Sequence, residues 1–227
     1  MLTDQHIVDL AVRVLPSEVL RMMGRPGRAS PDQKYLDLVN RFTSETASLV
    51  RPKGVYTIRT VQCMTDQELA LEGGPRFHGP VAGFLEPATR IAVSVVTIGP
   101  DLERLSRRSM SEGNLLEGFI LDAIGSAAVD AAADMMIEFL RRHEMGSQEE
   151  LTPPFSPGYC GMSVREQESL FEFVDAGAIG VSLTESCFMQ PLKSISALIG
   201  IGEAQRIVAR GSPCQWCDLT QCKMRRA

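Results

Sequence analysis

Apolar residues recur every three or four positions between residues 114 and 142, and this spacing predicts the longest helix of the chain. The apolar stripe consists of Leu116, Phe119, Ile120, Ala123, Ala127, Ala131 and Met135. Small residues fill the middle of this helix, so another backbone or a ligand can approach it closely. A second stripe, with members four residues apart, carries Asp122, Ser126, Asp130 and Asp134. The simplest interpretation of this polar stripe is a solvated edge.

Shorter helical patterns lie on both sides of this helix. Residues 7–15 show helical spacing, and Pro16 is expected to end that helix. Ser30 and Pro31 suit the start of a longer helix that runs past Phe42, because serine caps helices well and proline fits the first turn. The remaining helices are predicted at residues 101–108 and 164–174.

Four segments show the alternation or the β-branched run that is typical of strands. These are residues 55–61, 90–99, 179–186 and 194–202. Residues 145–158 are predicted to form a loop, because three prolines and two glycines fall within them. Helices and strands alternate without a regular βαβ order, so the expected fold class is α+β.

Composition narrows the class of protein. The chain has 227 residues, 44% of them hydrophobic, which suits one medium-sized domain or two small ones that share a core. A formal net charge of −5 argues against a nucleic-acid partner, which usually needs a basic face. The longest nearly apolar run, residues 91–99, is shorter than the roughly 20 residues of a membrane helix. The first ten residues lack a secretory pattern, so we expect a soluble, cytoplasmic protein with no membrane partner.

Common cofactor motifs are missing from the sequence. Gly200 and Gly202 form a Gly-x-Gly pair, but neither a complete dinucleotide fingerprint nor a P-loop lysine follows. The three histidines, at positions 6, 78 and 143, are not spaced as zinc-protease ligands. An Asp-x-His-x-x-Gly motif for carrying cobalamin is also missing, so the chain is not expected to hold cobalamin by itself.

Residues 154–161 form the first candidate ligand site. Two prolines and two glycines predict a rigid, irregular backbone that can present its own N–H and C=O groups to a planar ligand. Tyr159 adds an aromatic face and a hydroxyl. The alternative is a tight crossing loop that binds nothing.

Residues 181–191 form the second candidate site. A period of two places Glu185 on the same strand face as Val181 and Leu183. A carboxylate at the end of an apolar strand face needs a buried donor or a bound cation. A strand end that is exposed to water explains the same pattern equally well.

Three of the six cysteines, Cys214, Cys217 and Cys222, lie within nine residues of one another. The C-x2-C spacing is a strong short signal for metal ligands, and it favours an iron–sulfur cluster somewhat over zinc. Cys160 and Cys187 are candidates for the fourth ligand. The alternative is three reduced surface thiols without a metal. Positive charge follows at Lys223, Arg225 and Arg226, where it can steer an acidic electron donor or simply be solvated.

Four separated segments carry a resemblance to a known family. They are TIGP at 97–100, GNLLEGFILDAIGSAAVDAAAD at 113–134, FSPGYCG at 155–161 and GVSLTESCFMQPLKSISALIGIG at 180–202. In this order they resemble the activation domain of vitamin B12-dependent methionine synthase, and especially its short, stand-alone members. The resemblance implies an α+β fold with a twisted antiparallel sheet and flanking helices. We therefore expect an N-terminal helical region (1–50), an activation-domain-like region (51–205) and a Cys-rich metal-binding tail (206–227).

The resemblance implies a function in reactivation. In that family, cobalamin that has been oxidised to cob(II)alamin is reduced and then methylated by S-adenosylmethionine. Reduction of cob(II)alamin is uphill, and methyl transfer removes the reduced product. The activation domain places the methyl donor against cobalt, which is catalysis by proximity. Here the cobalamin would lie on a corrinoid-binding protein or a methionine synthase core on a separate chain.

The resemblance also implies site residues. Pro157, Gly158 and Tyr159 match the family's turn, which holds the adenosyl moiety through backbone contacts. Glu185 lies in the family's Leu-Thr-Glu-Ser strand, close to the ligand. Asp130 matches an acidic helix residue that can meet the amino group or the sulfonium charge.

One departure from the family concerns the carboxylate of the ligand. The family has an arginine three residues before the Pro-Gly-Tyr turn, where this chain has Pro154, and Arg165 is the candidate substitute. The alternative function is a corrinoid-docking and redox module that does not bind S-adenosylmethionine. In that hypothesis the C-terminal cysteines, which bind an iron–sulfur centre or zinc, are the working part.

Overall fold

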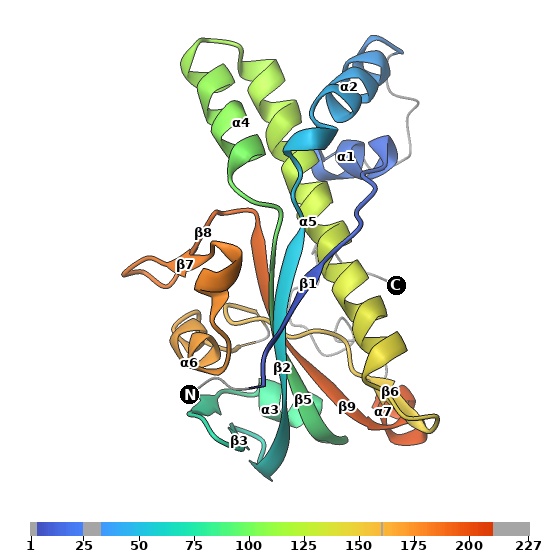
Figure 1. Ribbon diagram of the computed structural model, residues 1–227, viewed down its shortest axis with the longest axis vertical. Helices are drawn as coiled ribbons and strands as arrows, with labels where there is room; N and C mark the ends of the chain where they lie inside the picture. The colour runs from blue at the N-terminus through green and yellow to red at the C-terminus, as the bar shows by residue number, and fades with distance from the viewer. Residues whose placement is uncertain (1–3, 25–32, 160, 211–227) are drawn as a thin grey trace.

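The computed structural model describes residues 4–24, 33–159 and 161–210. Its main element is an antiparallel sheet with strand order β4-β3-β2-β5-β9-β6, in which β1 pairs with the first half of β2 (Figure 1). The strands of the sheet are β1 (His6–Asp9), β2 (Lys53–Met64), β3 (Glu68–Leu71), β4 (Arg76–His78), β5 (Ala88–Thr97), β6 (Glu149–Leu151) and β9 (Ser194–Glu203). A separate hairpin consists of β7 (Ser182–Leu183) and β8 (Met189–Gln190).

Helices flank the sheet on both faces. The long helix α5 crosses one face, and α6 and the β7–β8 hairpin lie on the other side of the sheet (Figure 1). The helices are α1 (Pro16–Met22), α2 (Gln33–Glu45), α3 (Val81–Leu85), α4 (Asp101–Ser111), α5 (Leu115–His143), α6 (Glu166–Phe173) and α7 (Ala204–Arg210). Short 3-10 turns are η1 (Ala47–Leu49) and η2 (Ala176–Ile179). The predicted α+β class with a flanked antiparallel sheet is confirmed.

The two faces of the sheet bury two separate apolar clusters. On one face, the small residues of α5 pack against β9 through Ala197, Ile199 and Ile201, which alternate as the sequence predicts. Residues 4–24 and 33–50 contribute to this same cluster, so they complete its core. On the other face, β5 and β9 pack against α6 and the segment that begins at Phe155.

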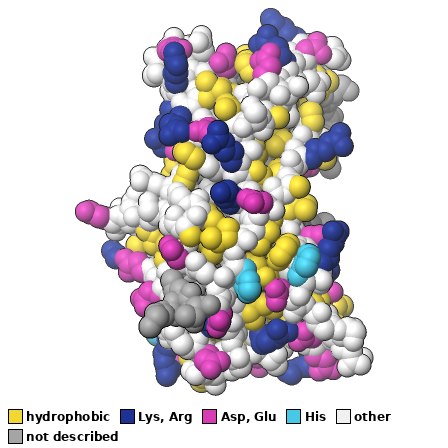
Figure 2. All heavy atoms as spheres, in the orientation of Figure 1, with side chains coloured by type: hydrophobic (Ala, Val, Ile, Leu, Met, Phe, Trp, Pro, Cys, Tyr) yellow, Lys and Arg dark blue, Asp and Glu magenta, His cyan; other side chains and the backbone are white. Residues whose placement is uncertain are grey.

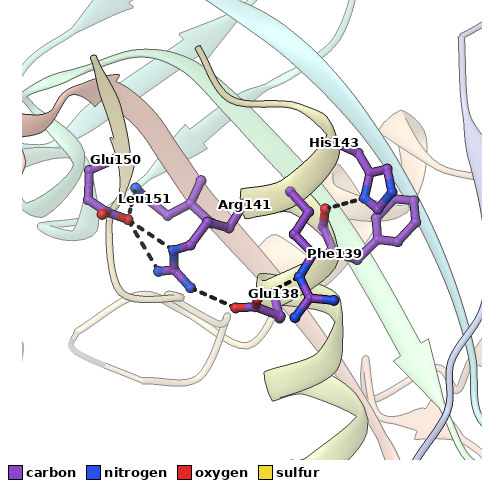
Figure 3. A network of polar contacts seen from close by, with 7 residues as sticks. Glu138, Phe139, Arg141, His143, Glu150 and Leu151 are labelled. Atoms are coloured by element: carbon purple, nitrogen blue, oxygen red, sulfur yellow. Dashed lines mark hydrogen bonds and ion pairs between the residues drawn. The ribbon is translucent and has the colours of Figure 1, made fainter. Parts of the chain in front are cut away.

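The C-terminal turn of α5 is tied to β6 by a network of ion pairs. Arg141 Nη2 lies 3.2 Å from Glu150 Oε1, and Glu138 pairs with both Arg141 and Arg142 (Figure 3). His143 Nδ1 lies 2.9 Å from the carbonyl oxygen of Phe139 on the same helix. Exposed pairs of this kind each contribute little to stability, so their main effect is to orient the end of the helix.

Most predicted elements are present with shifted ends, but three expectations are wrong. Residues 7–15 form no helix: His6–Asp9 is strand β1, and Pro16 begins helix α1 rather than ending one. Proline fits the first helical position because its missing N–H would have no intrahelical partner there. The predicted loop at 145–158 also contains strand β6.

The predicted strand at 179–186 is the third error. Residues 176–179 form the 3-10 turn η2, and only Ser182–Leu183 is extended before the chain turns back to β8. Gly180 has a φ of +78°, which ends η2 and interrupts any strand at this point. In the described part of the chain, no helix has both the length and the apolar character to cross a membrane.

Candidate functional site

The candidate turn within residues 154–161 is anchored to the central strand β9. Phe155 and Leu198 exchange both backbone hydrogen bonds, with N···O distances of 3.0 and 2.8 Å. The Ser156 hydroxyl donates to the carbonyl oxygen of Ser196 at 2.6 Å. Phe155 is buried and stacks on Phe84 with a ring-centroid distance of 5.4 Å. The turn therefore starts from a fixed position on the sheet.

Backbone bonds within the turn present Tyr159 to solvent. The Tyr159 N–H donates to Ser156 O at 3.1 Å, and the Gly158 N–H donates to Met162 O at 2.9 Å. Gly158 has a φ of +92°, which glycine adopts without the steric penalty of a Cβ. Pro157 is buried and Gly158 is exposed, while Tyr159 is 71% exposed. A rigid turn thus carries an aromatic ring that packs on little of this chain.

Helix α6 lies beside the turn and is joined to the same strand. The Ser196 hydroxyl donates to Gln167 Oε1 at 2.8 Å, and both side chains are buried. Ser196 therefore fixes the turn through its carbonyl group and α6 through its hydroxyl. Arg165 precedes the first residue of α6 and is exposed. It forms no ion pair with a residue that the structure describes.

The β7–β8 hairpin lies against α6. Cys187, in the hairpin turn, donates its thiol hydrogen to Glu168 Oε1 at 3.3 Å. Burial and the Glu168 carboxylate raise the pKa of this thiol, and the positive charge of Arg165 acts in the opposite direction. The hydrogen bond between Cys187 and Glu168 therefore holds the hairpin turn beside α6.

Glu185 lies in the hairpin turn and is exposed. Strand β7 ends at Leu183, so the predicted position of Glu185 on an apolar strand face is wrong. Phe188, three residues on, is 58% exposed. Sequence reasoning did not single out Phe188, because an apolar residue after a predicted strand is expected to be buried.

We group four exposed residues, from the Tyr159 turn, the residue before α6 and the hairpin, under the name turn–hairpin surface: Tyr159, Arg165, Glu185 and Phe188. Two exposed aromatic rings accompany a cation and an anion, and neither charge has an ion-pair partner among the described residues. An aromatic ring can stack on a planar heterocycle. A guanidinium can bind a carboxylate, and a carboxylate can accept from an ammonium group or lie beside a sulfonium. The surface therefore offers complementary groups for a zwitterionic ligand that has a planar ring.

Asp130 does not belong to the turn–hairpin surface. It belongs to α5, which covers the opposite face of the sheet, and it lies 3.5 Å from Arg21 Nη2 of α1. Asp122 of the same polar stripe pairs with Lys193 Nζ at 2.7 Å, and that lysine is only 15% exposed. The segments that carry Tyr159 and Glu185 both contribute to the apolar cluster on one face of the sheet, whereas Asp130 pairs with Arg21 of α1 on the other.

The predicted metal site cannot be placed here. Cys214, Cys217 and Cys222 lie outside the described residues, as does Cys160. Cys187 is described, and its thiol contacts Glu168. Within residues 4–24, 33–159 and 161–210, no group of three or more metal-binding side chains comes together. Pro154 is exposed and carries no charge, so the position at which the family has an arginine offers no positive charge to a ligand.

Comparisons with known proteins agree with this architecture. A family model described as "Vitamin B12 dependent methionine synthase, activation domain" matches residues 57–209. Among solved structures, a crystal structure of the MetH reactivation domain bound to AdoHcy matches with a TM-score of 0.70 and 16% sequence identity. The match covers 86% of this chain and 78% of that chain. A search of curated protein sequences found no match. Because the family model matches more than half of this chain, the chain belongs to the activation-domain family of vitamin B12-dependent methionine synthases.

Proposed function

We propose that this protein presents S-adenosylmethionine at the turn–hairpin surface for the reductive remethylation of cobalamin that is bound to a separate protein. The observation that carries the proposal is the Tyr159 turn. Its backbone is fixed to β9 at two points, yet its aromatic ring is 71% exposed. A site that must hold a ligand against the surface of another protein needs this combination, because a rigid, outward-facing platform provides proximity without closing over the ligand.

Each charged part of the proposed ligand has a counterpart on the surface. Pro157 and Gly158 shape the backbone that faces the adenosyl group, and Tyr159 provides the stacking face. Arg165 takes the role of the missing family arginine and binds the methionine carboxylate. Glu185 faces the amino group and the sulfonium. We assign no ligand contact to Asp130, because it pairs with Arg21 on the other face of the sheet.

The solved relative supports this choice of ligand by analogy. That domain was crystallised with AdoHcy, the product that remains after S-adenosylmethionine has given up its methyl group. When bound, S-adenosylmethionine supplies an electrophilic methyl group on a sulfonium. The residues of this chain bind and orient that donor and leave its methyl group accessible to the partner.

The proposed partner is a cobalamin-binding methionine synthase core or a related corrinoid methyltransferase on another chain. An electron donor is also required, because the oxidised cofactor must be reduced before it can be methylated. Cys63 and Cys187 are free thiols. Free thiols are typical of a reducing compartment, so we place the reaction in the cytoplasm.

Calorimetric titration of the full chain with S-adenosylmethionine tests the proposed site. We expect saturable binding, with affinity lowered at least about tenfold in Tyr159→Ala and in Arg165→Gln, since each removes a direct contact. Arg206→Gln is the matched control, because Arg206 is also exposed and unpaired among the described residues but lies on α7. Unchanged affinity in both site variants, or a similar loss in the control, would refute the assignment.

A second function is favoured by Pro154, which removes the family's carboxylate-binding arginine. The chain would then act as a corrinoid-docking and redox module whose cysteines Cys214, Cys217 and Cys222 bind an iron–sulfur centre or zinc. The same titration separates the two functions, because this second one predicts no saturable heat. It also predicts that Cys217→Ser loses both bound metal and activity, whereas the methyl-donor function predicts an unchanged affinity for S-adenosylmethionine in that variant.

A further inference from the structure

The turn of the β7–β8 hairpin, residues 184–188, has an unusual backbone conformation. The hairpin projects from the side of the molecule, and an acidic side chain lies at the outer end of this projection (Figure 1, Figure 2). Among the described residues, Cys187 is the one residue other than glycine with a positive φ, at +61°. This left-handed conformation is disfavoured for a residue with a Cβ, so the contacts around Cys187 must hold it in place.

Three hydrogen bonds within the turn converge on Thr184. The Cys187 N–H donates to Thr184 O at 2.9 Å, and the Thr184 N–H donates to Phe188 O at 2.9 Å. The Phe188 N–H donates to the Thr184 hydroxyl oxygen at 3.1 Å. Glu185, Ser186 and Phe188 are exposed, whereas Cys187 is only 2% exposed. Cys187 is thus a single buried side chain among exposed neighbours.

The thiol of Cys187 fixes this turn to helix α6. Its Sγ lies 3.3 Å from Glu168 Oε1, and this is the one side-chain hydrogen bond from residues 184–188 to a described residue outside the turn. The Glu168 N–H donates to Arg165 O at 3.0 Å, so the two residues are one helical turn apart. Residues three positions apart share a face of a helix. The hairpin turn is therefore anchored on the face of α6 that carries Arg165.

We propose that Glu168 and Cys187 are positioning residues, which set the spacing between Arg165 and Glu185 and thereby select a ligand that carries both a carboxylate and an amino group. This inference rests on the function proposed above, in which Arg165 binds the carboxylate and Glu185 faces the amino group. Neither positioning residue needs to touch the ligand. Their hydrogen bond holds the turn against α6 before the ligand binds, so binding does not have to order the turn.

Calorimetric titration of the full chain with two ligands separates positioning from a general structural role. S-adenosylmethionine carries the adenosyl group and both charged groups of the amino acid, whereas 5′-methylthioadenosine carries the adenosyl group and a neutral thioether. In Glu168→Leu, we expect the affinity for S-adenosylmethionine to fall at least about tenfold and that for methylthioadenosine to stay within about twofold. Glu168→Gln keeps an Oε1 acceptor, so it should bind both ligands as the wild type does. An equal loss for both ligands, or no loss for S-adenosylmethionine, would overturn the proposal.

Glu172→Leu is the matched control, because Glu172 is exposed on the same helix and forms no hydrogen bond with a described residue. Both affinities should be unchanged in this variant.

Hydrogen exchange of the ligand-free protein tests the anchor without the proposed function. The amide hydrogens of Cys187 and Phe188 should exchange several-fold faster in Glu168→Leu than in Glu172→Leu, because the turn opens more often once its anchor is lost. A wild type that binds no S-adenosylmethionine would refute the proposed function, while faster exchange would still support the anchor. Equal exchange rates in the two variants would overturn the positioning role of Glu168.

Discussion

Ser196 bonds both the Tyr159 turn and helix α6. A double-mutant cycle at Ser196 and Gln167 tests whether its hydrogen bond to α6 stabilises the protein. Its hydroxyl donates to Gln167 Oε1 at 2.8 Å, and both side chains are at least 95% buried. In Ser196→Ala the Gln167 carbonyl stays buried without its donor, which costs about 1–3 kcal/mol of unfolding free energy. For a chain of this length, that loss lowers the melting temperature by roughly 2–12 °C.

The double variant distinguishes a specific hydrogen bond from a simple packing defect. Gln167→Leu alone leaves the Ser196 hydroxyl unpaired, whereas Ser196→Ala with Gln167→Leu removes both polar groups together. We expect the double variant to be about 1–2 kcal/mol more stable than the sum of the two single losses predicts. Urea unfolding followed by far-UV circular dichroism measures each free energy, provided that the m-value stays constant.

The cycle needs an exposed serine as its control. Ser186→Ala, in the solvent-exposed turn of the hairpin, should change stability by less than about 0.5 kcal/mol. Additive losses at positions 196 and 167, within about 0.5 kcal/mol, would show that the two side chains do not act through their hydrogen bond. The description of how α6 is held on the sheet would then be wrong.

Three further predictions concern stability and reactivity. Gly202→Ala would place a Cβ 2.5 Å from a backbone oxygen, so we expect a loss of about 3 kcal/mol in urea unfolding. A backbone N–H and Arg90 lower the pKa of Glu149. The stability that Glu149 contributes is therefore present above its unfolded pKa and is lost as the pH falls. Glu149→Gln should flatten the stability–pH curve below about pH 5. Burial raises the pKa of Cys187, so mass spectrometry should find it alkylated more slowly at pH 8 than the exposed Cys63.

Local patterns were sufficient to predict much of this fold. The long apolar stripe predicts α5, and the β-branched runs predict β5 and β9, because each of these elements repeats its pattern over several turns or strand pairs. The segment around β1 is only four residues long, too short for a period of 2 to be distinguished from a period of 3.6. Its strand conformation depends on pairing with β2, which no local pattern contains.

The candidate site, too, could be predicted only in part from local sequence patterns. Prolines and glycines predict an irregular turn at Tyr159, since their backbone preferences are local. The hydrogen bond from Cys187 of the hairpin turn to Glu168 depends on how α6 packs, and the pairing of Asp130 with Arg21 depends on α1. Charges that look equivalent along a helix can therefore belong to opposite faces of the molecule.

Methyl transfer to cobalamin tests the central claim most directly. A methionine synthase core without its own activation domain, loaded with cob(II)alamin, is incubated anaerobically with titanium(III) citrate and methyl-labelled S-adenosylmethionine. One electron from the reductant and one methyl group from the donor should give labelled methylcobalamin and S-adenosylhomocysteine only when this chain is present. Tyr159→Ala should lower the yield at limiting donor concentration, and Arg206→Gln should not. Equal labelling with and without the chain would contradict the account.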